Sequence, residues 1–511
     1  MKSFAIRRPL AGMWASLVAS VALCIGLLLV GMSPAKAWAS ATLCVNPSGS
    51  NGCYANVQNA IDAVSAVGTT ISIAPGRYTA TCSGPACSVA SISVSAANGS
   101  SLAGLAIRCR KDDGRSAVLN ATGLDHAVYV GGVSGVTVKG CVAKNADREG
   151  ILVENSADDH IANNEVLNND QSMGLTVGTG SPPCPTFISP GTPGTSAILC
   201  CPDAYSGGPG NFPEDNDDCG EGIHLRGVTQ SVVEGNSVHD NIGGILLSDE
   251  TGPNSNNLIV DNSSSHNLKF GGDCGVTLAS HVMCGPGSSD AAGCLRAEPV
   301  EGVLQANGVF HNAVVNNVLE QDGASGAGIF TNPGGPPGAA TKAYGNLISE
   351  NVVEDNGQPG ISIHVHAANG NADNNVITEN TVSGNGGDSE AEGPTPPHTG
   401  IEVLSNAAFG VPFGAAAPIA GTVVSQNKVL DEDIDLWMGN TDTTVNVFLN
   451  DLLGNGAVGL ENGGSGTAVA TDDYWGCPKG PGATGCSSIS NTAGGTVVSS
   501  PFLSQPVNPE Q

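Results

Sequence analysis

The sequence NVVEDNGQPGI at residues 351–361 is one copy of a pattern that recurs along the chain. An Asn is followed by a variable residue and then Val or Leu, a second polar residue comes five positions after the first, and a Gly-apolar step such as Gly360-Ile361 usually ends the copy. The first Asn recurs at Asn164, Asn236, Asn262, Asn317, Asn351, Asn380, Asn427 and Asn450. The second polar position holds Asn169, Asn241, Asn267, Asp322, Asn356, Asn385, Glu432 and Asn455. A repeat of this length determines the fold.

The spacing between copies varies, and it is 23 residues at Asn427–Asn450, 26 at Asn236–Asn262 and 29 at Asn351–Asn380. A base period in the low twenties with insertions predicts one coil of a parallel β-solenoid for each copy.

Residues 360–364 predict a short strand of such a coil. Alternation would point Ile361 and Ile363 inward, and Ser362 and His364 outward. Equivalent positions would stack about 4.8 Å apart from coil to coil. Stacked Asn side chains could then hydrogen-bond along the axis, and the glycines would permit tight corners between strands.

The repeat resembles that of the right-handed parallel β-helix proteins, the pectin lyase-like superfamily, over residues 42–503. The resemblance implies an all-β, single-stranded right-handed parallel β-helix (β-solenoid) with an N-terminal helical cap and loop insertions. Residues 56–64 have helical spacing, and the strand that follows resembles the family's N-terminal cap. Residues 473–476 (DYWG), with Gly480-Pro481-Gly482 after them, resemble a closing motif of such proteins.

The sequence predicts three segments. Residues 1–37 read as a signal peptide, because a basic start is followed by an apolar run and by a small-residue cleavage site at Ala35-Lys36-Ala37. An uncleaved membrane anchor stays open as an alternative. Residues 38–80 are expected to form the N-terminal cap and first strand. Residues 81–511 are expected to form the β-helix, with insertions near 178–219, 279–299, 386–399 and 406–421 and a C-terminal closing segment.

Composition fits a turn-rich β protein, with 71 glycines, 13 % charged residues and 40 % hydrophobic residues. The formal net charge is −29, and loss of the four basic residues of residues 1–37 would leave −33. That charge disfavours nucleic acid and anionic membranes as partners, and it disfavours a polyanionic substrate unless calcium bridges the two. We expect a monomer, secreted to the extracellular space or the periplasm, with no membrane span once the signal is cleaved.

Fifteen of the 16 cysteines follow the predicted signal, and disulfides are the default expectation for an exported protein. Close pairs are Cys44/Cys53, Cys82/Cys87 and Cys477/Cys486, and Cys109/Cys141 could link neighbouring coils. The odd count leaves one thiol unassigned. Zinc is the rival explanation, but the chain contains no CxxC pair.

The predicted insertions should border one face of the solenoid, where outward residues would form a column. Candidate catalytic residues in it are Glu154, His224, Arg226, Glu250, His364 and Glu402, and candidate carbohydrate-binding residues are Asp435 and Trp437. Carboxylates, His, Arg and an aromatic residue suit sugar binding and acid–base chemistry. The alternative explanation is a solvated strand face, since His224 and Arg226 alternate with Ile223 and Leu225 and His364 adjoins Val365.

No cofactor is required by the sequence, but calcium is a candidate. The acidic segment with Asp215, Asp217, Asp218 and Glu221 offers carboxylate oxygens of the kind that Ca²⁺ prefers. A solubilising loop would have the same composition.

Two functions remain open. The first is an exported protein that binds or processes a poly- or oligosaccharide as a lyase, hydrolase or epimerase. The second is a non-catalytic cell-surface or extracellular binding solenoid. The sequence lacks the Gly-His-Gly turn of polygalacturonase-type hydrolases, the Asp-Pro-His-Asp motif of alginate epimerases and the Arg-centred signature of pectate lyases, so no catalytic residue can be carried over.

Overall fold

The computed structural model describes residues 41–79, 90–96, 99–169, 221–249, 251–267, 274–280, 304–315, 317, 327–333, 341–365, 370–386, 396–404, 419–439, 444–454 and 458–507. From Thr42 onward these residues belong to one compact unit, Thr42–Gln511. The predicted signal peptide lies outside them. Among the residues described, no helix has the length and apolar character needed to cross a membrane.

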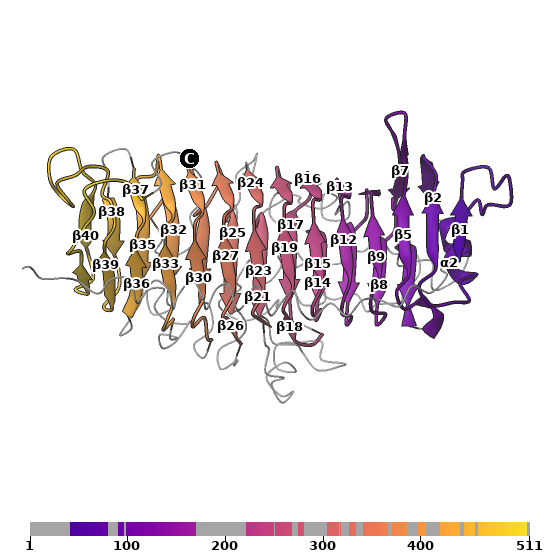
Figure 1. Cartoon of the computed structure of the whole chain (residues 1–511), viewed down its shortest axis with the longest axis horizontal. Coiled ribbons are helices and arrows are strands. Elements are labelled where there is room, and N and C mark those ends of the chain that lie inside the picture. Colours follow the sequence, from indigo (N-terminus) through magenta and orange to yellow (C-terminus); the bar gives the residue numbers. More distant parts are fainter. Residues whose placement is uncertain are drawn as a thin grey trace, which may run out of the picture. The chain divides into compact units, whose positions relative to one another are not determined.

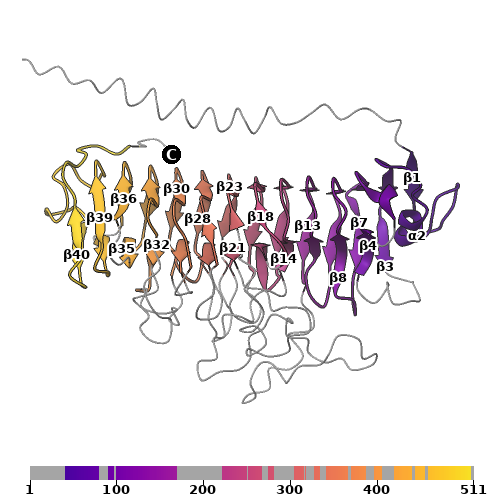
Figure 2. The same cartoon turned by 90° about the horizontal axis from the view of Figure 1, so that it is seen from below.

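The unit is built from three parallel sheets whose strands follow one another in rotation, so that each turn of the chain adds one strand to each sheet (Figures 1 and 2). Sheet A contains β1 (Thr42–Val45), β2 (Thr70–Ile73), β5 (Ala106–Cys109), β9 (Thr137–Lys139), β12 (His160–Ala162), β15 (Val232–Glu234), β19 (Leu258–Val260), β23 (Gly308–Phe310), β27 (Leu347–Ser349), β30 (Val376–Thr378), β33 (Val423–Ser425), β36 (Thr444–Phe448), β39 (Thr467–Thr471) and β41 (Thr496–Val498).

Sheets B and C run beside it. Sheet B contains β3 (Gly76–Thr79), β7 (Arg115–Asn120), β10 (Val142–Lys144), β13 (Glu165–Leu167), β16 (Ser237–His239), β20 (Ser263–Ser265), β24 (Ala313–Val315), β28 (Val352–Glu354), β31 (Thr381–Ser383), β34 (Lys428–Leu430) and β37 (Asp451–Leu453), with β6 (Lys111–Asp112) paired to β7. Sheet C contains β4 (Ala90–Ser95), β8 (His126–Gly131), β11 (Ile151–Glu154), β14 (Glu221–Arg226), β17 (Gly243–Ser248), β21 (Val276–Ser280), β25 (Ile329–Pro333), β29 (Ile361–His364), β32 (Thr399–Leu404), β35 (Ile434–Gly439), β38 (Val458–Asn462) and β40 (Ser488–Asn491). A small fourth sheet joins β18 (Asn254–Ser255), β22 (Leu304–Gln305) and β26 (Ala343–Tyr344). This is the right-handed parallel β-helix predicted from the repeat.

Strand alternation places one apolar column of each sheet in a continuous core. In sheet C, Ile361 pairs with Ile329 and Ile401, and all three are fully buried. Ser362 and His364 lie on the opposite side of β29, as predicted, yet their exposed fractions are only 1 % and 3 %. The outer side of sheet C in this region is therefore buried, which the sequence did not indicate.

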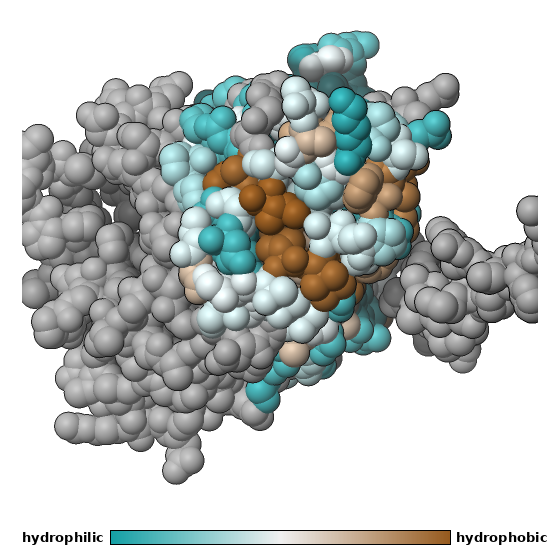
Figure 3. Space-filling model, turned by 90° about the vertical axis from the view of Figure 1, so that its left-hand side faces the viewer, coloured by the Kyte–Doolittle hydropathy of each residue, from teal (hydrophilic) through white to brown (hydrophobic). Residues whose placement is uncertain are grey.

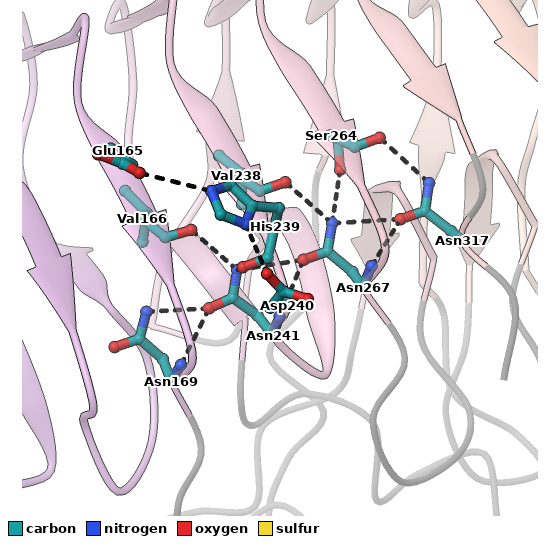
Figure 4. Close-up of polar contacts among 10 residues, drawn as sticks. All are labelled: Glu165, Val166, Asn169, Val238, His239, Asp240, Asn241, Ser264, Asn267 and Asn317. Carbon is teal, nitrogen blue, oxygen red and sulfur yellow. Dashed lines mark hydrogen bonds and ion pairs between the residues drawn. The ribbon is translucent and has the colours of Figure 1, made fainter. Parts of the chain in front are cut away.

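Asn side chains stack in ladders at all three corners of the coil. The amide of Asn241 donates to Asn267 Oδ1 at 3.1 Å and to the Val166 carbonyl oxygen of the preceding coil at 3.1 Å, and the backbone N–H of Asn241 also donates to Asn267 Oδ1 (Figure 4). Each Asn thus satisfies buried polar groups of its own coil and of both neighbours. The predicted axial hydrogen bonding is confirmed.

The ladders are defined by the corner that each one occupies. The A–B ladder contains Asn164, Asn236, Asn262, Asn312, Asn351, Asn380, Asn427 and Asn450 and ends at Asp473. The B–C ladder contains Asn169, Asn241, Asn267, Asn317, Asn356 and Asn385 and ends at Glu432. The C–A ladder contains Asn257, Asn307, Asn346 and Asn375.

One assignment of the sequence repeat was wrong by five residues. Asn312, not Asn317, donates to Asn351 in the A–B ladder, and Asn317 donates to Asn356 in the B–C ladder. Asn occupies both the A–B corner and the B–C corner of this coil. The sequence pattern therefore matched Asn317, which lies at the B–C corner, although the equivalent of Asn351 is Asn312. The predicted partners Asp322 and Asn455 lie outside the described residues.

The glycines of the repeat serve close approach rather than tight corners. Gly150 and Gly222 do not have positive φ, but a Cβ at either position would come within 2.4 Å or 2.2 Å of a Val Cγ1 in sheet B. The corners themselves are mostly made by non-glycine residues with positive φ, such as Asp261 at 55° and Glu350 at 59°. The prediction that these glycines permit tight corners was therefore wrong, and they are needed because neighbouring side chains leave no room for a Cβ.

Both ends carry additional structure. The predicted N-terminal helix is α2 (Val57–Asp62), whose first turn is capped by the Asn56 side chain. A single 3₁₀ turn, η3 (Ser100–Leu102), precedes β5. At the other end Trp475 is fully buried in the core, and Figure 3 shows a band of apolar side chains across that end.

Three of the expected disulfides are present: Cys44–Cys53, Cys109–Cys141 and Cys477–Cys486. The Cys109–Cys141 bond joins the ends of neighbouring coils, as the sequence suggested. The pair Cys82/Cys87 lies outside the described residues.

The predicted insertions all adjoin sheet C. The first leads into β14, the second follows β21, the third leads into β32 and the fourth follows β32. Residues 279–280 belong to β21 and residue 399 to β32, so the second insertion begins later and the third ends earlier than predicted. Sheet C is therefore the face bordered by the variable connections of the chain.

Replacing Asn351 by Ala should lower the free energy of unfolding by about 2–4 kcal/mol. The change removes the acceptor for the Asn312 backbone N–H and amide and the donor to the Val309 carbonyl, which leaves buried polar groups unpaired. Urea unfolding would measure it. Asn446→Ala, on the outer side of β36, is the control and should cost about 0.5 kcal/mol or less; equal losses for the two variants would contradict the ladder's role.

Stability should fall as the pH rises from about 4 to 7. Burial raises the pKa of Asp473 from 3.8 to about 7, although hydrogen bonds from Asn450 oppose the rise. The folded chain therefore keeps a proton that the unfolded chain releases, and each unit of pH in this range costs stability.

Asp473→Asn should flatten part of that pH dependence and raise stability at pH 7.5 by at most about 4 kcal/mol. Glu432, whose pKa burial also raises to about 7, should account for some of the remaining slope. Thermal melts between pH 4.5 and 8 would measure both effects. Asp112→Asn, an exposed carboxyl on β6, should leave the slope unchanged; a slope as steep in Asp473→Asn as in the native protein would refute the assignment.

Candidate functional site

Four side chains on or beside the adjacent sheet C strands β8, β11 and β14 form a buried His–Glu cluster: His126, Glu149, Glu221 and His224. Their exposed fractions are 5 %, 4 %, 1 % and 0 %. Glu149 and Glu221 each directly precede one of the close-approach glycines. The parallel register brings the two carboxylates together although 72 residues separate them in sequence.

The cluster is held by short polar distances. His126 Nδ1 lies 2.7 Å from Glu149 Oε2, and His224 Nδ1 lies 3.6 Å from Glu149 Oε1. His224 Nδ1 is also 4.0 Å from Glu221 Oε2. Glu149 thus sits between two imidazoles, and His224 faces both carboxylates.

A hydroxyl on the next strand fixes the orientation of His224. Its Nε2 lies 2.8 Å from Ser248 Oγ, which β17 places one coil further along. This contact leaves Nδ1 directed at the carboxylates. The ring therefore has one nitrogen anchored by the scaffold and the other available to the cluster.

Electrostatics favour the ionised form of Glu149. Complete burial by itself would raise the pKa of this carboxyl, but the opposing charges of His126 and His224 prevail and hold its pKa well below 4.5. Glu149 is consequently a carboxylate at neutral pH.

A second group, the Tyr–Glu–Arg edge, borders the cluster. Tyr129 donates its hydroxyl to Glu154 Oε2 at 3.2 Å, and Arg226 Nη2 lies 3.3 Å from the same oxygen. The side chains of Arg226 and Glu154 are 22 % and 17 % exposed, so solvent reaches this edge. Burial and the neighbouring Glu154 charge raise the pKa of the Tyr129 phenol above 10.0, which keeps it protonated. The rings of His126 and Tyr129 stack with centroids 6.0 Å apart, which connects the edge to the cluster.

The predicted column does not form one site. Glu154, His224 and Arg226 come together on β11 and β14, whereas His364 and Glu402 lie on β29 and β32. Four and five strand steps along sheet C separate β14 from β29 and β32, about 20–25 Å at the usual strand spacing. There Glu402 accepts a 2.6 Å hydrogen bond from Ser362, and His364 contacts the Phe330 ring edge-on.

The two residues predicted to bind carbohydrate are buried. Trp437 is 2 % exposed and packs with Leu404 and Ile434 in a small apolar cluster. Asp435 aligns with Gly400 of the preceding coil, so it occupies the close-approach position and not the outward column, which corrects its predicted place. Its carboxylate accepts from Gly454 N–H at 3.3 Å, and burial raises its pKa well above 3.8. Their burial does not support a role in sugar binding.

Several predicted residues cannot be placed. Glu250, Asp215, Asp217 and Asp218 lie outside the described residues. Glu221, the fourth residue of the predicted calcium set, belongs instead to the His–Glu cluster.

Sequence reasoning missed His126, Tyr129 and Glu149. It sought outward residues only after the Gly-apolar step, whereas Glu149 precedes its glycine. The signal was present as the tripeptide Glu-Gly-Ile, which occurs at residues 149–151 and again at 221–223 in matching register.

Comparison with solved structures finds similar chains at low sequence identity. The A-module of the Azotobacter vinelandii mannuronan C-5 epimerase AlgE6 is 12 % identical, with 88 % of this chain and 94 % of that chain covered at a TM-score of 0.42. An alginate lyase from Paenibacillus sp. str. FPU-7 is 12 % identical, with 89 % and 97 % covered at 0.32. The catalytic unit of a GH87 alpha-1,3-glucanase from Streptomyces thermodiastaticus is 11 % identical, with 88 % and 67 % covered at 0.39. No protein-family model matches the sequence, and no curated protein does.

Glu149→Gln should lower the free energy of unfolding by about 3 kcal/mol at neutral pH, because it removes the charge that both imidazoles face. Since the pKa of Glu149 is lowered in the folded state, its stabilisation is complete above about pH 4.5 and is lost as the pH falls through the folded value. The difference from the native protein should therefore shrink toward pH 3.

Chemical unfolding at pH 7, 5 and 3 would measure this difference. Glu165→Gln is the matched control, because Glu165 faces His239 at 3.8 Å with a half-exposed side chain and should matter little. A pH-independent loss in Glu149→Gln would contradict the ionised assignment.

Proposed function

We propose that this protein is an exported enzyme that processes a saccharide by acid–base chemistry at the Tyr–Glu–Arg edge, supported by the His–Glu cluster behind it. The observation that carries the proposal is the meeting of a protonated phenol, a carboxylate and a guanidinium, partly open to solvent, with two imidazoles adjacent. Acid–base catalysis requires groups of this kind within hydrogen-bond reach of one another.

Proton removal beside a sugar carboxylate, the step shared by lyases and epimerases, matches this set best. Such a step needs a base, a cation near the carboxylate and an acid for the leaving group or the opposite ring face. Glu154 can serve as the base, Arg226 as the cation and Tyr129 as the acid. A hydrolase would instead need one carboxylic acid that stays protonated, but the pKa of Glu149 is lowered.

Export is supported by the three described disulfides, since such bonds persist in oxidising compartments. The signal peptide of residues 1–37 is the corresponding sequence proposal.

A non-catalytic binding solenoid is the second candidate. The observation in its favour is that Arg226 and Glu154 already neutralise one another and that His224 is fully buried. A binding surface would need only the exposed edge.

The test is a screen of the purified protein on neutral and uronate-containing polysaccharides that records binding, unsaturated products, new reducing ends and epimer content. The proposal expects unsaturated or epimerised products. Tyr129→Phe and Arg226→Met should lower the rate at least about 100-fold.

His160→Gln is the control, because it removes an imidazole that pairs with a Glu at 2.9 Å on the outer side of sheet A, and its activity should match the native protein. Binding without turnover would select the second candidate. Turnover that survives Tyr129→Phe but is abolished by Glu402→Ala would move the site to β32.

A further inference from the structure

We infer that the His–Glu cluster is a binding site for a divalent transition-metal ion, with Glu149, Glu221 and His224 as ligands. Each offers one ligand atom, and the three atoms lie within 4.8 Å of one another on fully buried side chains. The inference goes beyond the proposed function and does not depend on it, since metal binding requires no substrate.

The orientation of His224 is the second observation. Its Nε2 is engaged by Ser248 Oγ at 2.8 Å, whereas its buried Nδ1 has no hydrogen-bond partner and faces two carboxylates. If Nε2 carries the proton, a nitrogen lone pair points at two negative groups, which is unfavourable unless a cation lies between them. Metal-ligating imidazoles are commonly held in this way by a hydrogen bond at the far nitrogen.

The Glu149–His126 contact is consistent with the same arrangement. His126 Nδ1 and Glu149 Oε2 are only 2.7 Å apart, yet neither atom makes a well-aligned hydrogen bond. His126 therefore lies close enough to become a fourth ligand or to orient Glu149.

A bound cation would balance the charge of the cluster. Two buried carboxylates face each other across His224, and the Arg226 guanidinium on the neighbouring edge is directed to Glu154. Burying carboxylates without compensation is costly. Protons on the imidazoles can provide that compensation, and a divalent ion provides it with direct bonds to both carboxylates.

The types of ligand atom indicate which metal ion the site would bind. An imidazole nitrogen with two carboxylate oxygens suits Zn²⁺ and related first-row ions, whereas Ca²⁺ prefers oxygen donors alone. Ligand atoms of a tetrahedral zinc site are about 3.3 Å apart. The observed 3.6 Å and 4.0 Å distances thus need only small side-chain shifts. Three ligands would leave a coordination position open.

The experiment uses Zn²⁺ itself. Purified protein is stripped with a chelator and titrated with Zn²⁺ by calorimetry, its metal content is measured after dialysis, and anomalous scattering at the zinc edge locates the ion in crystals. The expected result is one tightly bound ion within bonding distance of Glu149, Glu221 and His224.

Graded variants test the ligand roles. Ser248→Ala, which releases the orienting contact, should weaken binding roughly 10–100-fold. Glu221→Gln and His224→Gln, which remove ligands, should weaken it further. His239→Gln is the matched control, because His239 lies 2.7 Å from Asp240 and 3.8 Å from Glu165 in a solvent-exposed group of the same residue types, and binding should not change (Figure 4).

Three outcomes would overturn the inference: no stoichiometric zinc, equal affinity in His224→Gln and native protein, or preferential binding of Ca²⁺ at this position. Circular dichroism would check that the variants fold. If a ligand variant does not fold, the anomalous peak in the native protein alone decides. If the native protein binds no zinc but still turns over polysaccharide, the metal site is rejected and the proposed function stands.

Discussion

The Asn ladders are the interaction on which the rest of the structure depends. Each corner of a coil buries backbone groups that water cannot reach, and one Asn side chain satisfies groups on its own coil and on both neighbours. Because the amide donates in one direction, a carboxyl oxygen is a suitable last acceptor. Asp473 and Glu432 stand at the C-terminal ends of two ladders for this reason. Burial of these two carboxyl groups disfavours their ionised form, and it therefore raises both pKa values.

The strand register that the ladders fix also brings the site residues together. Once the ladders fix which residue stands beside which, residues separated by a long stretch of sequence become neighbours, as Glu149 and Glu221 do. The glycine after each of them is required because the chain passes within van der Waals distance of sheet B there. The polar groups of the cluster are consequently held by the backbone of three adjacent coils, and the Tyr–Glu–Arg edge follows from the same strands a few residues later.

The sequence was sufficient for the fold and only partly for the site. A repeated Asn followed by an apolar strand indicates stacked coils, so the solenoid and its axial hydrogen bonds could be anticipated. The cap helix could be anticipated from the helical spacing of residues 56–64. The register at Asn312 and Asn317 could not, because both corners begin with the same residue type. Alternation also predicted the outer side of β29 correctly but not its burial, since burial depends on chain segments remote in sequence.

The site residues divide in the same way. Glu154, His224 and Arg226 follow from alternation on neighbouring strands. Glu149 and His126 stand at the beginning of the strand, where simple alternation no longer states which way a side chain points. The predicted place of Asp435 was wrong for a similar reason. Asp435 stands where the neighbouring coil has Gly400, near the start of the strand, and alternation does not predict the side-chain direction there.

Hydrogen exchange of the native protein tests the dependence on the ladders most directly. Peptides that contain the corner residues Asn236, Asn262, Asn351 and Asn427 should exchange as slowly as the core strands, because their backbone N–H groups are buried donors in the ladders. They should open only with global unfolding, unlike the exposed β6–β7 turn. If the ladder corners exchange as fast as that exposed turn, the ladders do not hold the coils together and the account is wrong.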